Sequence, residues 1–147
     1  MKKLTKSLLI QIAVYIPAEV FLFLSYSIDR SSFHWATHFF VGNIVMFVGF
    51  SIWEYMTHRP VGWPLIWLLG GHLFAMAPDL LFRYAHIPHE RWMDIFFGHI
   101  TTHFIPGQNW TWYILFMISF GLYLFLGSPQ FLSYKRTPQG ELKNPSA

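Results

Sequence analysis

Four long apolar runs, separated by short polar or proline-containing segments, dominate the pattern of hydrophobic positions along this chain. They cover about residues 7–28, 33–56, 63–84 and 110–127. At ~1.5 Å per residue, a helix of about 20 residues crosses the ~30 Å hydrocarbon core of a bilayer. Each run is long enough to do so. The pattern therefore predicts an all-α, polytopic membrane protein with about four transmembrane helices.

A fifth, shorter segment lies between the third and fourth runs. Residues 91–105 read as one short helix that ends at Pro106. This segment is too short to cross a bilayer unaided, so we expect an interfacial or re-entrant helix. Residues 1–127 are expected to form a single transmembrane domain, followed by a polar and disordered tail over residues 128–147.

The composition supports a membrane protein and limits the possible chemistry. Charged residues make up 12% of the chain and hydrophobic residues 54%, whereas soluble domains average about 25% charged residues. The chain has no cysteine, so a bound metal would need nitrogen and oxygen ligands, which excludes iron–sulfur clusters. The net charge of +3 comes from basic residues at chain ends and loops, which is not the pattern of nucleic-acid binding.

The basic residues predict an orientation in the membrane. Four spans place both termini on one side, and the side richer in Lys and Arg faces the cytoplasm. We therefore expect an integral protein of the bacterial inner (plasma) membrane with both termini cytoplasmic. The expected cytoplasmic side carries Lys2, Lys3, Lys6, Arg59, Lys135, Arg136 and Lys143, and the other side carries Arg30, Arg83 and Arg91.

Most of the titratable chemistry lies between residues 70 and 107. This stretch holds five of the eight histidines and two of the three aspartates. Ionisable groups near lipid are costly and are functional by default. Under the predicted topology, His34, His38, Asp79, His86, His89, His99 and His103 gather toward the outer leaflet, whereas Glu54 and His58 lie at the cytoplasmic end.

Two HxxxH pairs at this outer end predict a metal site. His34 and His38 form one pair, and His99 and His103 form the other. On a helix, side chains four residues apart project from one face and can chelate a single ion. Asp79 follows Pro78 near a helix C-terminus, where negative charge is disfavoured, so a nearby cation would account for it. The alternative is a set of interfacial histidines that behave like the neighbouring tryptophans.

The order of these motifs resembles the bacterial inner-membrane metal-dependent hydrolases (the LexA-binding group). The matching segments are Thr37-His38 followed by Gly42, then Ala75-Met76-Ala77-Pro78-Asp79, and His99-Ile-Thr-Thr-His103. The resemblance covers about half of the chain and implies metal-binding roles for His38, Asp79 and His103. The chain departs from the family pattern where Ile100 follows His99, where Phe104 follows the last histidine, and where a second acidic residue after Asp79 is missing.

The leading interpretation is a membrane-embedded hydrolase in which a metal-activated water attacks an ester or phosphoester, with a lipid as the candidate substrate. Its metal would be zinc, with manganese or iron as alternatives. The expected metal ligands are His38, Asp79 and His103 with His72, and His34 and His99 are the expected catalytic residues or further ligands. Two other classes stay open. One is a histidine-ligated oxidoreductase with haem or di-iron, and the other is a non-enzymatic metal or proton carrier that uses Glu19, His72, Glu54 and His58.

Overall fold

The computed structural model describes residues 2–27, 32–106 and 108–128. Over these residues the fold is all-helical, and no strand is present. Four helices form the bundle: α1 (Lys2–Ser27), α2 (Ser32–Thr57), α3 (Pro64–Ala85) and α4 (Gln108–Leu126). Each of the four is long and apolar enough to cross a membrane, so the predicted fold class is confirmed. The tail beyond residue 128 lies outside the described residues.

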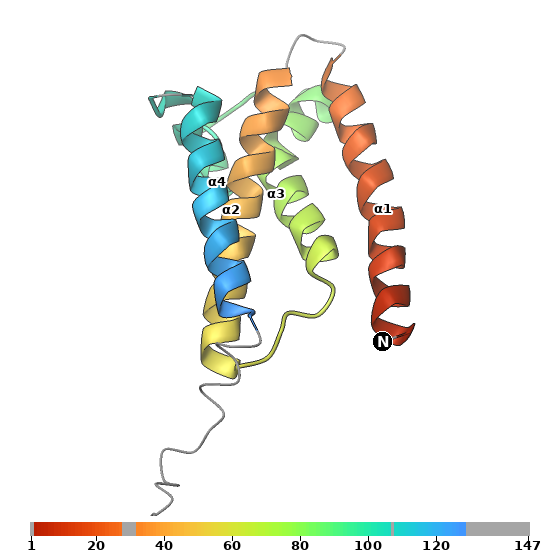
Figure 1. Ribbon diagram of the computed structural model, residues 1–147. Coiled ribbons are helices and arrows are strands. Elements are labelled where there is room, and N and C mark those ends of the chain that lie inside the picture. Colours follow the sequence, from red (N-terminus) through yellow and green to blue (C-terminus); the bar gives the residue numbers. More distant parts are fainter. Residues whose placement is uncertain (1, 28–31, 107, 129–147) are drawn as a thin grey trace, which may run out of the picture.

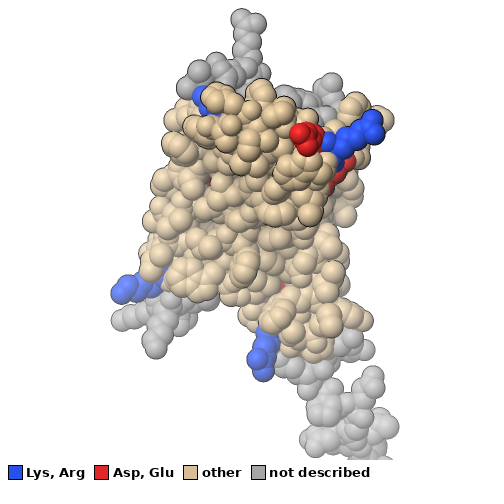
Figure 2. Space-filling model, turned by 180° about the vertical axis from the view of Figure 1, so that it is seen from behind, with Lys and Arg blue, Asp and Glu red and all other residues tan. Residues whose placement is uncertain are grey.

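The four helices run up and down, with α2 at the centre of the bundle. Helix α2 packs against α1, α3 and α4, while α1 and α4 stand on opposite sides of it (Figure 1). The start of α1 and the end of α4 lie at one end of the bundle, and the start of α2 and the end of α3 lie at the other. The face seen in Figure 2 carries its basic side chains near the two ends, with an almost uncharged belt between them.

The segment expected to be one short helix is broken into two 3₁₀ turns, η1 (Arg91–Ile95) and η2 (Thr101–Phe104). Between them, Phe97 and Gly98 both adopt positive φ angles, of 56° and 71°, which a helix does not tolerate. His99 follows Gly98 directly, so it lies outside the regular helix that the HxxxH spacing predicted.

Two glycines set the close approach of α2 and α3. A Cβ atom added to Gly42 would lie 2.6 Å from the carbonyl oxygen of Gly71, and one added to Gly71 would lie 2.5 Å from Cγ of Met46. Small residues at such crossings let two membrane helices pack backbone to backbone. The crossing brings the N-terminal half of α2, which carries His38, against α3, which carries Asp79.

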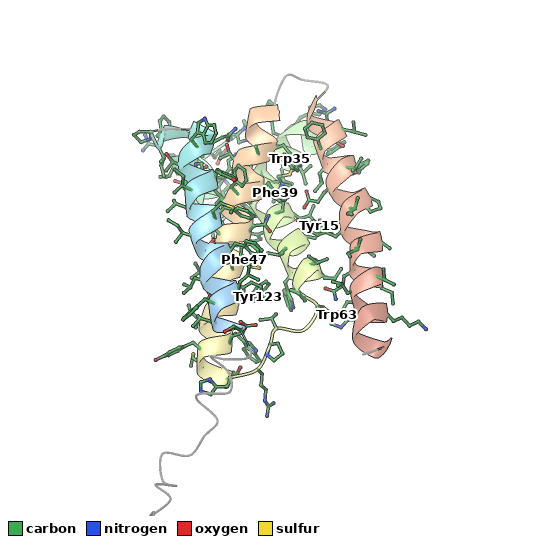
Figure 3. The ribbon with its side chains drawn as sticks, in the orientation of Figure 1. Tyr15, Trp35, Phe39, Phe47, Trp63 and Tyr123 are labelled. Atoms are coloured by element: carbon green, nitrogen blue, oxygen red, sulfur yellow. The ribbon has the colours of Figure 1, made fainter. Side chains whose placement is uncertain are left out.

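Aromatic side chains fill the bundle away from this crossing. Phe47 of α2 lies against Phe116, Phe120 and Tyr123 of α4, with ring centroids 5.1–5.7 Å apart. Figure 3 shows Phe47 and Tyr123 between these two helices. At the start of α3, the side chain of Gln11 from α1 accepts a hydrogen bond from the backbone N–H of Leu65 (3.1 Å), which satisfies one of the donors that a helix N-terminus leaves open.

Candidate metal centre

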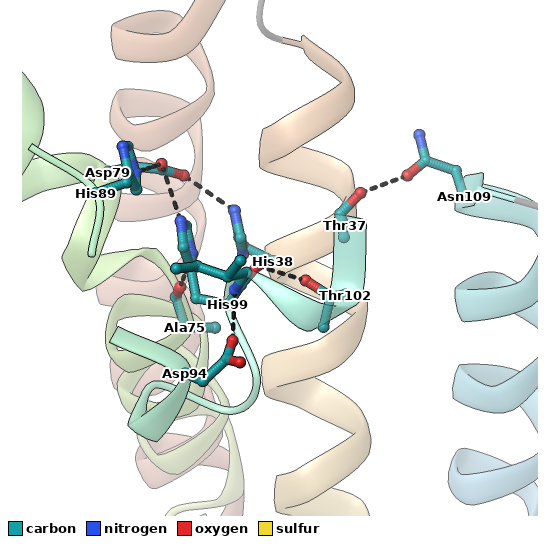
Figure 4. A network of polar contacts seen from close by, with 10 residues as sticks. Thr37, His38, Ala75, Asp79, His89, Asp94, His99, Thr102 and Asn109 are labelled. Carbon is teal, nitrogen blue, oxygen red and sulfur yellow. Dashed lines mark hydrogen bonds and ion pairs between the residues drawn. The ribbon is translucent and has the colours of Figure 1, made fainter. Parts of the chain in front are cut away.

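Three side chains from separate parts of the chain converge at one end of the bundle. His38 comes from α2, Asp79 from α3, and His99 from the turn that precedes η2 (Figure 4). The Nε2 atom of His38 lies 2.9 Å from Oδ2 of Asp79. The Nε2 atom of His99 lies 3.4 Å from Oδ1 of the same carboxylate. Asp79 is therefore approached on both of its oxygens by imidazole nitrogens.

This group fits a metal ion by geometry and by the chemistry of its donors. One possible ligand atom from each of His38, Asp79 and His99 lies within 4.8 Å of the other two. Nitrogen and oxygen donors of this kind suit zinc, manganese or iron. The two histidines are 1% and 2% exposed, so their ring nitrogens are held in a dry environment where an unpaired polar atom would be costly.

The hydrogen bonding of His99 strengthens this assignment. Its Nδ1 atom lies 3.4 Å from the carbonyl oxygen of Ala75. A carbonyl can only accept, so Nδ1 carries the hydrogen. In the neutral ring, Nε2 is then a bare lone pair, and this lone pair faces a carboxylate oxygen of Asp79. Two facing lone pairs repel each other. Either a proton on Nε2 or a metal ion between the two atoms relieves the repulsion, and a backbone bond to the other ring nitrogen is how proteins orient a ligating histidine.

A fourth residue, His89, completes the cluster from the loop between α3 and η1. Its Nε2 atom lies 2.9 Å from Oδ1 of Asp79, and its ring stacks on that of His99 with centroids 5.1 Å apart. The His89 side chain is 35% exposed, against 12% for Asp79. The cluster is therefore closed toward the bundle and open on the side of this loop.

Asp94 holds the turn that carries His99. Its carboxylate accepts hydrogen bonds from the backbone N–H groups of Ile100 (2.7 Å) and Thr101 (2.9 Å) and from the Thr101 hydroxyl (2.7 Å). These bonds favour the ionised form, and the Thr101 backbone N–H makes the largest contribution to lowering the pKa of Asp94 below its ordinary value of 3.8. The Thr102 hydroxyl donates to the carbonyl of His99 itself (2.9 Å).

Helix α4 is tied to the same end of the bundle by a hydrogen bond. The hydroxyl of Thr37, the residue before His38, donates to Oδ1 of Asn109 in the first turn of α4 (2.8 Å). Thr37 is 1% exposed. Beside His38, α2 and α4 are thus linked by a hydrogen bond as well as by aromatic packing.

Some of the expected site residues lie together in the structure and others do not. It brings together His38 and Asp79 as expected, and it adds His99, which was expected as a catalytic residue or further ligand. It places His72 elsewhere: Nδ1 of His72 pairs with Glu19 of α1 at 2.8 Å, and His72 is fully buried. The side chains of His34 and His103 lie outside the described part of the structure.

His89 was not assigned a role from the sequence, because a single histidine in a polar loop after Pro88 has no periodic relation to the other ligands. The only available signal was its position inside the histidine-rich stretch. At the opposite end of the bundle, Glu54 of α2 is 1% exposed and accepts a hydrogen bond from the backbone N–H of Val61 (3.4 Å). It therefore belongs to the packing of that end, as its predicted depth implied.

Comparison of the chain with models of protein families, with characterised proteins and with solved structures finds no match.

Proposed function

We propose that this protein is a membrane-embedded, metal-dependent hydrolase of the bacterial inner membrane. The observation that carries the proposal is the convergence of His38, His89 and His99 on the single carboxylate of Asp79. Three imidazoles and one carboxylate, gathered from separate elements in a largely apolar chain, are a costly arrangement for packing alone. The motif resemblance to inner-membrane metal-dependent hydrolases supports the same reading.

In this proposal His38, Asp79 and His99 are the ligands, and zinc is the favoured ion because catalytic zinc sites use three protein ligands and keep one position open. A bound zinc ion lowers the pKa of water toward neutrality and so supplies a hydrolytic nucleophile. The Ala75 carbonyl accepts a hydrogen bond from Nδ1 of His99 and so fixes its ring. The Asp94 carboxylate holds the turn that follows His99 by accepting from the backbone N–H of Ile100. These contacts preserve the ligand geometry while the substrate enters.

His89 is the residue to which we assign proton transfer. It is the most exposed of the three histidines that face Asp79, and its Nε2 atom lies 2.9 Å from Oδ1. Because Nε2 donates its hydrogen toward Asp79, the proton from water would be accepted at Nδ1 of His89 and passed to the surrounding solvent. The substrate bond, an ester or phosphoester, would approach from this side.

Hydrolysis of soluble chromogenic substrates by purified protein tests this function. p-Nitrophenyl butyrate and bis(p-nitrophenyl) phosphate report ester and phosphoester cleavage. We expect activity that a chelator abolishes and added zinc restores, and that Asp79→Ala lowers by on the order of 100-fold or more. His58→Ala, at the other end of the bundle, is the matched control and should keep full activity.

Cleavage that survives complete removal of metal would contradict the proposal. So would a Soret absorbance band in the purified protein, which would indicate haem bound by histidines and place the protein among the oxidoreductases.

A further inference from the structure

An apolar groove runs between α1 and α3 on the side of the bundle away from α4. Its volume is about 460 Å³, within the range of small-molecule binding sites, ~300–1,000 Å³. The residues that line it are Ala18, Phe21, Leu22, Leu73, Leu80 and Tyr84. Apart from the phenol of Tyr84, every lining side chain is a hydrocarbon. The groove therefore suits a hydrocarbon ligand.

The position of the groove between two membrane spans indicates which hydrocarbon could bind in it. Ala18 and Leu22 lie in the apolar span Lys6–Ser25, and Leu73 and Leu80 lie in the span Pro64–Ala85. The medium at this depth of a bilayer is the acyl chains of lipids. A groove between two spans that is lined by aliphatic and aromatic side chains fits one such chain.

The outer end of the groove carries a positive charge. Arg83, in the last turn of α3, has its guanidinium carbon 5.9 Å from the ring centroid of Tyr84, a distance at which a cation is attracted to an aromatic face. Tyr84 is itself a lining residue. Arginine is the side chain best matched to a phosphate group. A lipid whose chain lies in the groove would place its headgroup at this arginine.

The groove and the metal centre share helix α3. Leu80, which lines the groove, follows Asp79 directly, and Arg83 lies four residues beyond Asp79. Four residues correspond to ~6 Å along a helix axis and to the same helix face. A phospholipid held there would place its phosphate and ester bonds at about the depth of Asp79, on the adjacent face of α3. Among the described residues, none of the metal centre lines the groove itself.

We propose that the α1–α3 groove binds an acyl chain of a phospholipid while Arg83 binds its phosphate, so that the substrate of the metal centre is a membrane phospholipid. The identification of the bound lipid as a substrate rests on the proposed hydrolase function. The binding site itself is defined by the groove and by Arg83, and it can be tested without catalysis.

The experiment measures lipid binding in proteoliposomes. The probes are dioleoyl phosphatidic acid and dioleoylglycerol, each with a diazirine in one acyl chain, and the cross-linked peptides are identified by mass spectrometry. Wild-type protein should cross-link through α1 and α3 and should prefer the phosphate-bearing probe. Leu73→Trp and Ala18→Phe fill the groove and should lower this cross-linking by about tenfold, which corresponds to ~1.4 kcal/mol.

Two further variants separate the groove from the remaining lipid contacts. Ile114→Trp, at a 55% exposed position on α4, adds the same bulk away from the groove and should leave cross-linking to α1 and α3 unchanged. Arg83→Gln should remove the preference for phosphatidic acid over dioleoylglycerol and keep chain binding. Cross-linking that is equal on α4 and unaffected by both groove-filling variants would overturn the proposal, as would an unchanged phosphate preference in Arg83→Gln.

Failure of the groove and failure of the hydrolase are distinguishable. If Asp79→Ala binds phosphatidic acid as well as the wild type does, the groove stands whether or not hydrolysis is found. If soluble p-nitrophenyl substrates are cleaved in a metal-dependent way and the groove-filling variants bind lipid normally, the hydrolase stands and the groove proposal is wrong.

Discussion

The buried histidines of this bundle differ in the carboxylate that each one faces. His38 and His99 face Asp79 near the open end, where His89 also reaches the carboxylate. His72 faces Glu19, with Nδ1 at 2.8 and 3.0 Å from the two carboxylate oxygens, and its ring is flanked by Trp35 and Phe39. Three imidazoles contact Asp79, whereas one contacts Glu19. Asp79 therefore has the surroundings of a metal ligand, and Glu19 those of a buried pairing partner.

The pairing of Glu19 with His72 predicts a stability effect without a metal effect. Glu19→Ala leaves a fully buried imidazole without its partner, which should lower the free energy of unfolding by about 1–3 kcal/mol. Thermal unfolding in detergent measures the loss, and metal per folded protein should not change. The double variant Glu19→Leu/His72→Phe replaces both polar groups and should recover part of the stability. A single Glu19→Ala variant as stable as the wild type would contradict this role.

The Asp94 carboxylate predicts how the site responds to acid. Hydrogen bonds from Thr101 and Ile100 lower its pKa below 3.8, so the stability that it contributes is present above that pH and is lost as the pH falls through the lowered value. Protons compete with a metal ion for histidine nitrogens, so metal binding should weaken as the pH falls. In metal-free protein, the carboxyl-carbon NMR signal of Asp94 itself should therefore titrate below 3.8, the ordinary value for an aspartate.

The corresponding variant is Asp94→Ala, which removes all three hydrogen bonds to the turn. It should weaken metal binding by ~10–100-fold, as loss of an outer-shell partner does, while Asp94→Asn, which can still accept some of these bonds, should lose less. A carboxyl signal of Asp94 that titrates above 3.8 in the metal-free protein would contradict this role of Asp94 in the turn.

At the scale of secondary structure, the four long helices could be predicted from the sequence and the segment between α3 and α4 could not. A run of about 20 apolar residues in lipid forms a helix, because a helix satisfies every backbone hydrogen-bonding group within the segment. The conformation of residues 91–105 depends instead on the Asp94 side chain and on the positive φ angles at Phe97 and Gly98. Neither follows from hydrophobic periodicity.

The same difference explains which parts of the site were predicted. His38 and Asp79 lie on α2 and α3, so their depth follows from helix geometry. His89 and His99 lie on irregular segments, and their approach to Asp79 depends on tertiary contacts. The HxxxH spacing of His99 and His103 pointed to the correct region through a helical geometry that the turn does not have.

The α2–α3 crossing predicts different outcomes for Gly42, which lies in the crossing, and Gly70, which does not. Gly42→Ala places a Cβ 2.6 Å from the Gly71 carbonyl oxygen, so the helices must separate. We expect a loss of about 1–3 kcal/mol in stability and weaker metal binding, because His38 moves away from Asp79. Gly70→Ala meets nothing within 4 Å and should be neutral or slightly stabilising. Equal thermal stability of the two variants would contradict the proposed crossing.

At the scale of the whole molecule, the candidate metal centre lies at one end of the bundle. The start of α1 and the end of α4 lie at the opposite end. The excess of Lys and Arg predicts that the second end is cytoplasmic. Reporter fusions at residue 60 and residue 90 should therefore report the cytoplasmic side and the outer side. Reporters on the same side of the membrane would rule out the four-span arrangement and with it the gathering of His38 and Asp79 at one depth.

The metal content of purified protein tests the central claim most directly. Elemental analysis of detergent-purified wild type and of His38→Ala, Asp79→Ala, His99→Ala and His58→Ala gives metal per protein, with monodispersity and circular dichroism as checks of folding. We expect about one ion in the wild type and in His58→Ala, and a large loss in each of the other three, because each lacks a ligand of the same ion. Full metal in folded Asp79→Ala and His99→Ala would contradict the account.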